Sequence, residues 1–217
     1  MTDYPARRIM MVDTQVRPSD VTKFPIIDAM LRVPREAFVP KPLAEAAYVG
    51  ENLNLGDGRV LLEPRTLAKF LDALNIGETD LVLDVACGMG YSTAVIAQMA
   101  EAVVGIDDNA TMVAEGQAAL SAMGADNADI RQAELTTGAP GSGPYDVIMV
   151  QGGVETFPQA LADQLAEGGR VGCLFMDGAL GVAHIGVKTD GRIAWRDAFN
   201  AAAPVLEGFA RERAFSF

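Results

Sequence analysis

The chain has few of the residues on which metal sites, disulfide frameworks and acid–base catalysis usually depend. Its 217 residues include only two cysteines, Cys87 and Cys173, a single histidine, His184, and one tryptophan. The two cysteines form no metal-ligand pattern and lie in apolar, strand-like segments, so we expect buried free thiols and no bound metal. His184 lies in an apolar strand pattern, which favours a structural role over a catalytic one.

The sequence also lacks long apolar runs and an excess of positive charge. Its longest apolar segments have the length of strands and fall well short of the roughly 20 residues that a membrane helix needs. No signal peptide is recognisable at the start. The formal net charge of −12 argues against nucleic-acid binding, which requires clustered cations. We expect a cytoplasmic protein that binds neither membranes nor nucleic acid. Its oligomeric state has no signature in the sequence.

Strand-like and helix-like segments alternate from residue 81 onwards, and half of the residues are hydrophobic. The order is typical of an α/β protein with a mostly parallel sheet and helices on both faces, a three-layer Rossmann-like fold. The dipeptide Asp190-Gly191 between two strand-like segments predicts an antiparallel C-terminal hairpin. The expected strands are 81–85, 102–106, 128–132, 145–150, 170–175, 182–187 and 192–195, and the expected helices are 91–100, 110–123 and 158–165.

The first 75 residues follow a different pattern. A helix is expected from Ser19-Asp20 to Val33, and a second from Pro64 to Leu74, ended by Gly77. We therefore expect one domain over 1–217, with a helical substrate-side elaboration in 1–75 and the cofactor-binding core and terminal strands in 76–217. Residues 209–217 could form a last edge strand or an oligomer contact.

The most informative segment is 81–107, where a buried strand leads into a turn of small residues, then a helix, then a strand that ends in Asp107. Such a turn lets the backbone approach a ligand, and an acid at the next strand end can accept hydrogen bonds from ribose hydroxyls. A Walker loop is absent from the sequence. Gly88 and Gly90 are followed by Thr93, where a nicotinamide site would have a third glycine.

The string Asp84-Val85-Ala86-Cys87-Gly88-Met89-Gly90-Tyr91 resembles the first motif of the S-adenosylmethionine-dependent methyltransferases. The resemblance implies that Asp107 binds the ribose and that Glu134 lies near the adenine amino group. Ala86 replaces the usual first glycine, and a methyl group there is compatible with a β-like backbone. The expected cofactor-binding residues are Asp84, Ala86, Cys87, Gly88, Gly90, Tyr91, Asp107, Asp108, Glu134 and Leu135.

Other segments resemble the protein-L-isoaspartate O-methyltransferases, over roughly residues 15–177. They include Val33-Pro34-Arg35-Glu36-Ala37-Phe38-Val39-Pro40, residues 53–58 and 63–68, and the strand at 144–150. The resemblance implies an enzyme of Rossmann-like methyltransferase fold that uses S-adenosyl-L-methionine. Its acceptor would be the carboxylate of an isoaspartyl residue in a damaged peptide or protein.

The chain departs from that family's pattern within 58–64, where Val60 and Leu62 replace a threonine and a serine that help to bind the substrate carboxylate. Arg59 or Arg65 could supply a replacement, since guanidinium groups bind carboxylates through two parallel hydrogen bonds. The substrate-side candidates are Leu62, Glu63, Arg65 and Gln151, and no residue is assigned as catalytic. Three interpretations stay open: isoaspartyl methylation, methylation of another acceptor, and a non-catalytic cofactor-binding scaffold.

Overall fold

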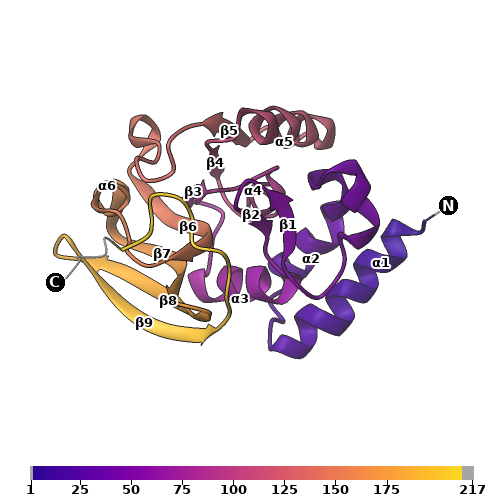
Figure 1. The fold of residues 1–217 in the computed structure, drawn as a ribbon, viewed down its shortest axis with the longest axis horizontal. Coiled ribbons are helices and arrows are strands. Elements are labelled where there is room, and N and C mark those ends of the chain that lie inside the picture. Colours follow the sequence, from indigo (N-terminus) through magenta and orange to yellow (C-terminus); the bar gives the residue numbers. More distant parts are fainter. Residues whose placement is uncertain (1, 212–217) are drawn as a thin grey trace, which may run out of the picture.

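A computed structural model describes residues 2–211 of the chain, and its centre is a seven-stranded sheet (Figure 1). The strands lie in the order β5-β4-β3-β6-β7-β8-β9. The five strands from β5 to β7 are parallel, and β8 and β9 are antiparallel. The strands are β3 (Leu81–Val85), β4 (Ala102–Asp107), β5 (Ala128–Gln132), β6 (Tyr145–Val154), β7 (Leu165–Asp177), β8 (Leu180–Thr189) and β9 (Arg192–Asn200). The predicted α/β class, the mostly parallel sheet and the antiparallel hairpin are confirmed.

Two hydrophobic clusters cover the two faces of the sheet, which gives the molecule its three layers. Along β3, Val82 belongs to one cluster while Leu83 and Val85 belong to the other. Successive side chains of a strand point to opposite faces, so β3 is buried on both sides, as an inner parallel strand requires. The helices of the sheet region are α3 (Pro64–Leu74), α4 (Tyr91–Ala97), α5 (Ala110–Met123) and α6 (Gln159–Gln164).

The N-terminal region packs short helices and one hairpin against this core. Its elements are α1 (Tyr4–Met11), a π-helical turn (Val12–Val16), 3-10 turns (Arg17–Ser19, Arg35–Phe38 and Lys41–Ala46), α2 (Phe24–Arg32), and the antiparallel strands β1 (Leu53–Gly56) and β2 (Arg59–Leu61). The predicted start of a helix at Ser19-Asp20 is wrong. Asp20 has a left-handed backbone (φ 64°), and α2 begins only at Phe24, where Pro25 suits the first turn.

Other boundaries also differ from the sequence predictions. Strands β4, β6, β7, β8 and β9 are longer than expected, and α6 covers Gln159–Gln164 instead of 158–165. Helix α4 ends at Ala97 instead of residue 100, and α3 is ended by Asn75 in a left-handed conformation (φ 49°) instead of by Gly77. Within the predicted edge strand 209–217, Phe209 to Arg211 are not in a strand, and residues 212–217 lie outside the described residues. Among residues 2–211, no helix combines the length and the apolar character needed to cross a bilayer.

The strand order fixes where a ligand site can form. β3 pairs with β4 on one side and with β6 on the other. Successive strands are therefore added to one side of β3 first and then to its other side, which makes β3 the switch point of the sheet. Ligands of open α/β sheets bind at such a switch point, outside the carboxyl ends of the strands. The register places Val85 beside both Ile106 and Val150. The residues that follow these three positions therefore meet at one edge of the sheet.

Candidate active site

The turn after β3 is tightly wound, and three of its residues have a left-handed backbone. These are Ala86 (φ 59°), Gly88 (φ 56°) and Gly90 (φ 86°). The backbone of Ala86 is not in the β-like conformation in which a methyl group is easily tolerated, so this alanine carries the strain that a glycine would avoid. A Cβ added to Gly90 would lie 2.3 Å from Cδ1 of Ile130, which leaves no room there for a side chain. The turn therefore needs glycine at position 90 for both backbone and packing reasons.

Asp84, at the end of β3, is fully buried and binds only neighbouring protein groups. Its Oδ2 accepts hydrogen bonds from the hydroxyls of Ser92 (2.6 Å) and Thr93 (2.7 Å), and its Oδ1 accepts one from Nε2 of Gln151 (2.7 Å). Burial raises the pKa of Asp84 to about 6, and the charge of Asp107 adds to that rise, while the three hydrogen bonds oppose it. Asp84 thus links the first turn of α4 to β6 beneath the glycine turn.

Asp107, at the end of β4, is also completely buried and is held by a cation. Its Oδ2 accepts hydrogen bonds from Nε of Arg59 (3.0 Å) and from the backbone N–H of Gly88 (2.9 Å), and its Oδ1 accepts one from the N–H of Asn109 (3.0 Å). The other arm of the Arg59 guanidinium reaches Oδ1 of Asp108 at 2.5 Å. Arg59 is only 3% exposed. It clamps the chain's own carboxylates and is not available as a surface clamp for a substrate.

The β1–β2 hairpin carries Arg59 and covers the glycine turn. A Cβ on Gly88 would lie 3.1 Å from Cδ1 of Leu55, so this leucine lies directly over the turn. At the tip of the hairpin, Oδ2 of Asp57 accepts a hydrogen bond from Nδ2 of Asn109 (2.7 Å). The hairpin is thus docked over the carboxyl ends of β3 and β4.

Glu134 and Leu135, the candidates beside the adenine, follow β5. The exposed Glu134 carboxylate accepts hydrogen bonds from the hydroxyls of Thr136 (2.9 Å) and Thr137 (3.1 Å). Leu135 is buried in the cluster that also contains Val85 and Ile106. The two residues lie at the same edge of the sheet as Asp107, because β5 is paired in parallel with β4.

The four substrate-side candidates come from two places in the fold: Leu62 and Glu63 lie between β2 and α3 and Arg65 in the first turn of α3, whereas Gln151 lies in β6. Leu62 is 2% exposed, and its carbonyl accepts a hydrogen bond from the Arg35 guanidinium (2.7 Å). Oε1 of Glu63 accepts a hydrogen bond from the Thr66 hydroxyl (2.7 Å) in the first turn of α3. Arg65 has longer contacts of 3.4 Å, one to Oε1 of Glu63 and one to the carbonyl of Asn200, and its side chain is 40% exposed.

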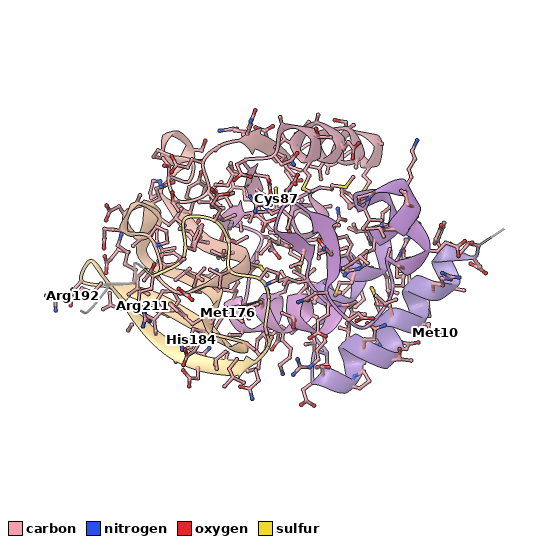
Figure 2. All side chains as sticks on the ribbon, in the orientation of Figure 1. Met10, Cys87, Met176, His184, Arg192 and Arg211 are labelled. Atoms are coloured by element: carbon pink, nitrogen blue, oxygen red, sulfur yellow. The ribbon has the colours of Figure 1, made fainter. Side chains whose placement is uncertain are left out.

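Two cysteines and the histidine were expected to have no catalytic role. Both thiols are free and buried, and burial raises the pKa of Cys87 and that of Cys173. In Figure 2, Cys87 lies at the centre of the molecule, while His184 lies away from it on the terminal strands. Nε2 of His184 contacts Oδ1 of Asp197 on the neighbouring strand β9 at 2.9 Å.

The sequence matches a known protein family over most of its length. The model of the family Protein-L-isoaspartate(D-aspartate) O-methyltransferase matches residues 10–176. The chain belongs to this family. A protein-L-isoaspartate O-methyltransferase 1 of Rhodopseudomonas palustris is 36% identical over 170 residues, which are 78% of this chain and 69% of the relative. The corresponding enzyme of Syntrophobacter fumaroxidans is 34% identical over 171 residues, 79% of this chain and 80% of the relative.

Solved structures agree on the fold. A protein-L-isoaspartate O-methyltransferase structure superimposes with a TM-score of 0.81 at 23% identity, covering 93% of this chain and 66% of that one. A Plasmodium falciparum protein assigned to the same enzymes, solved with S-adenosyl-L-homocysteine, gives a TM-score of 0.78 at 18% identity. It covers 95% of this chain and 99% of that one. These likenesses establish a Rossmann-like methyltransferase fold.

Within the protein-L-isoaspartate O-methyltransferase region of the chain, Arg35 is a structural residue that the sequence reasoning missed. It lies in the 33–40 string and is fully buried. Its Nε donates to the carbonyl of Ala47 (2.5 Å), and its guanidinium lies 4.7 Å from the centre of the Tyr91 ring. Arg35 therefore joins the N-terminal region to the start of α4. The only sequence signal for this role was its place in the family string.

A second feature missed in the sequence lies beyond residue 176, where the family match ends. The segment 203–209 crosses the carboxyl end of β6, as the yellow chain in front of the sheet in Figure 1 shows. Gly153 donates to the carbonyl of Pro204 (2.8 Å) and accepts from the N–H of Leu206 (2.9 Å). A Cβ on Gly152 would lie 2.7 Å from Cγ of Leu206. The segment thus covers the strand end next to Gln151.

Proposed function

We propose that the chain is an S-adenosyl-L-methionine-dependent methyltransferase that esterifies the carboxylate of isoaspartyl residues in peptides or proteins. The observation that carries this proposal is the family match over residues 10–176, which includes the glycine turn, the acid that follows it on β4 and the segment between β2 and α3. The core 76–217 would bind the cofactor, and residues 1–75 would contribute the substrate side. A cytoplasmic location remains our prediction.

The residues at the switch point fit an adenosyl cofactor in kind. Gly88 and Gly90 provide a backbone turn without side chains, and Asp107 and Asp108 are carboxylates at a strand end, where ribose hydroxyls find their acceptors. Glu134 and Leu135 provide a polar and an apolar group for the adenine. When bound, the cofactor supplies an electrophilic methyl group on a sulfonium sulfur. The Arg59 contact to Asp107 must change for the ribose to bind.

The chain's own part in this reaction is to hold the acceptor carboxylate and to exclude water. A carboxylate is already an anion, so the reaction needs little proton transfer. Positioning then supplies most of the rate. The hairpin and the segment 203–209 cover the strand ends from two sides, which strengthens the attraction between an anion and a sulfonium by lowering the local dielectric.

We propose Arg65 as the group that binds the acceptor carboxylate in place of the missing hydroxyls. Val60 and Leu62 offer no hydrogen bonds from their side chains. Arg65 follows Leu62 closely on the substrate side and is 40% exposed. Its hydrogen bonds are long, at 3.4 Å, and its guanidinium lies 5.9 Å from the centre of the Phe199 ring, so it can turn toward an anion. Glu63 is engaged with Thr66 and with this same arginine, which reduces its repulsion of an acidic substrate.

The proposal is tested by transfer of a labelled methyl group from S-adenosylmethionine to an isoaspartyl peptide, measured as base-labile ester. The same peptide with a normal aspartyl residue is the control. We expect label only in the isoaspartyl peptide, with KM raised at least tenfold in Arg65→Gln and unchanged in Arg32→Gln, an exposed arginine on α2. Label in neither peptide, with methylation of another acceptor in a substrate screen, would replace isoaspartyl repair by a different methyltransferase activity.

A further inference from the structure

The ion pairs of Arg59 with Asp107 and Asp108, which we call the Arg59 clamp, occupy the acceptor atoms that a ribose would need. Nε of Arg59 is 3.0 Å from Oδ2 of Asp107, and the terminal nitrogen is 2.5 Å from Oδ1 of Asp108. Asp107 has no exposed surface. An ionised carboxylate offers about four lone-pair positions, and here the chain itself fills three of them. A bound ribose would therefore compete with Arg59 for the Asp107 carboxylate.

Asp107 can release Arg59 without becoming an unpaired buried charge. Its carboxylate keeps the backbone N–H groups of Gly88 and Asn109 when the guanidinium leaves. Ribose hydroxyls would then take the lone pairs that Arg59 vacates. A buried carboxylate that lost every partner would be strongly destabilised, but this one would exchange one donor for another. The buried ion pair of the clamp, Arg59–Asp107, can therefore be replaced by contacts to the ribose.

The other ion pair of the clamp, Arg59–Asp108, is accessible to water. Asp108 is 47% exposed, so its bond to Arg59 competes with solvent and is the weaker of the two ion pairs. Arg59 belongs to the β1–β2 hairpin, a two-stranded unit whose tip, Asp57 and Gly58, is exposed. Isolated two-stranded hairpins are marginally stable, so this one depends on its contacts with the core. Breaking the Asp108 contact thus loosens the whole hairpin.

We propose that Arg59 controls entry of the cofactor: in the ligand-free protein it closes the hairpin over the carboxyl ends of β3 and β4, and the adenosyl ribose displaces it from Asp107. This inference rests on the proposed function, because it takes the cofactor to be S-adenosylmethionine. It adds a specific competitor at the ribose position. Arg59 acts here by occupying the site and is not a catalytic residue.

The test compares wild type with Arg59→Gln, Asp108→Asn and the control Arg32→Gln, which removes an exposed ion pair to Asp28 on α2. Isothermal calorimetry with S-adenosylhomocysteine measures affinity. Hydrogen exchange of peptides covering 53–61, without ligand, measures closure of the hairpin. We expect at least tenfold tighter binding in Arg59→Gln and no change in Arg32→Gln. Asp108→Asn is read by hydrogen exchange alone, because Asp108 is itself a candidate ribose acceptor. Exchange in 53–61 should be faster in Arg59→Gln and Asp108→Asn only.

Asp108→Asn keeps the test decisive if Arg59→Gln does not fold, since it leaves every buried group in place: unchanged exchange of 53–61 in this variant would overturn the clamp. Binding by wild type with equal or weaker binding by Arg59→Gln would also overturn the clamp and leave the proposed function standing. Binding by a variant but not by wild type would support the clamp in its strongest form. No binding by any of the four proteins at millimolar ligand would overturn the clamp together with the choice of cofactor.

Discussion

The buried carboxylate of Asp84 should make the protein's stability depend on pH in a way that one isosteric substitution removes. The pKa of Asp84 is about 6 in the folded protein, against 3.8 for an unperturbed aspartate. Because the folded state keeps its proton to higher pH, the stability associated with Asp84 is fully present below pH 3.8. It is lost as the pH rises through 6. Asparagine resembles the protonated form, so Asp84→Asn should be free of this loss.

The magnitude follows from linkage between the two pKa values. The cost of ionising Asp84 in the folded protein is about 2 kcal/mol at pH 5 and about 3 kcal/mol at pH 8. Asp84→Asn can keep its contacts, since its oxygen can accept from Gln151 and its amide can donate to a hydroxyl of Ser92 or Thr93. We therefore expect the variant to be more stable than wild type, by a margin that grows by roughly 1 kcal/mol from pH 5 to pH 8.

Urea denaturation at pH 5, 6, 7 and 8 measures this margin, because effects of other groups cancel in the difference between the two proteins. Asp126→Asn, at an exposed position after α5, is the control and should stay within about 0.5 kcal/mol of wild type at every pH. A margin that is constant over this range, or that reverses in favour of wild type at pH 8, would refute the argument that burial dominates at Asp84.

Three further substitutions probe the turn and the substrate side. Ala86→Gly should raise the free energy of unfolding by about 0.5–1 kcal/mol, since Ala86 has a φ of 59°, and thermal unfolding would reveal a destabilisation if this is wrong. Gly90→Ala should lower the free energy of unfolding by about 1–3 kcal/mol, because its Cβ would meet Ile130. It should also weaken S-adenosylhomocysteine binding, and an unchanged dissociation constant in calorimetry would contradict this. Leu62→Ser should cost about 2–4 kcal/mol in denaturant unfolding, since Leu62 is buried, and a neutral result would show that the site is open to water.

The parts of the fold that follow from local pattern could be predicted from the sequence. Strands β3 and β5 and helices α3 and α5 have the predicted bounds. Helix α3 has a clear apolar period and a proline at its start, and α5 lies between the N-cap Asn109 and the left-handed Gly124. The start of α2 was predicted wrongly because Ser19-Asp20 has the composition of an N-cap. Only the backbone shows that Asp20 is left-handed and that the helix begins beside Pro25.

The site was harder to predict because its decisive contacts join residues far apart in the sequence. Arg59 and Asp107 are 48 positions apart, and no periodicity links a hairpin arginine to a strand end. The backbone of Ala86 could not be predicted either, since alanine favours negative φ and its left-handed conformation is imposed by the surrounding turn. The segment 203–209 has no motif, and it reaches the site only through backbone bonds to Gly153.

These long-range contacts bear on how tightly the protein can bind its cofactor. If the closed hairpin is the dominant ligand-free state, the apparent dissociation constant equals the intrinsic one divided by the open fraction. An open fraction of about 1% would weaken binding about a hundredfold, equivalent to about 2.7 kcal/mol. Such a gap lies within the range expected for a partly buried ion pair that has a half-exposed arm at Asp108. The same closure that weakens binding also covers the strand ends, so the residue that delays entry of the cofactor belongs to the element that would later keep water away from the sulfonium.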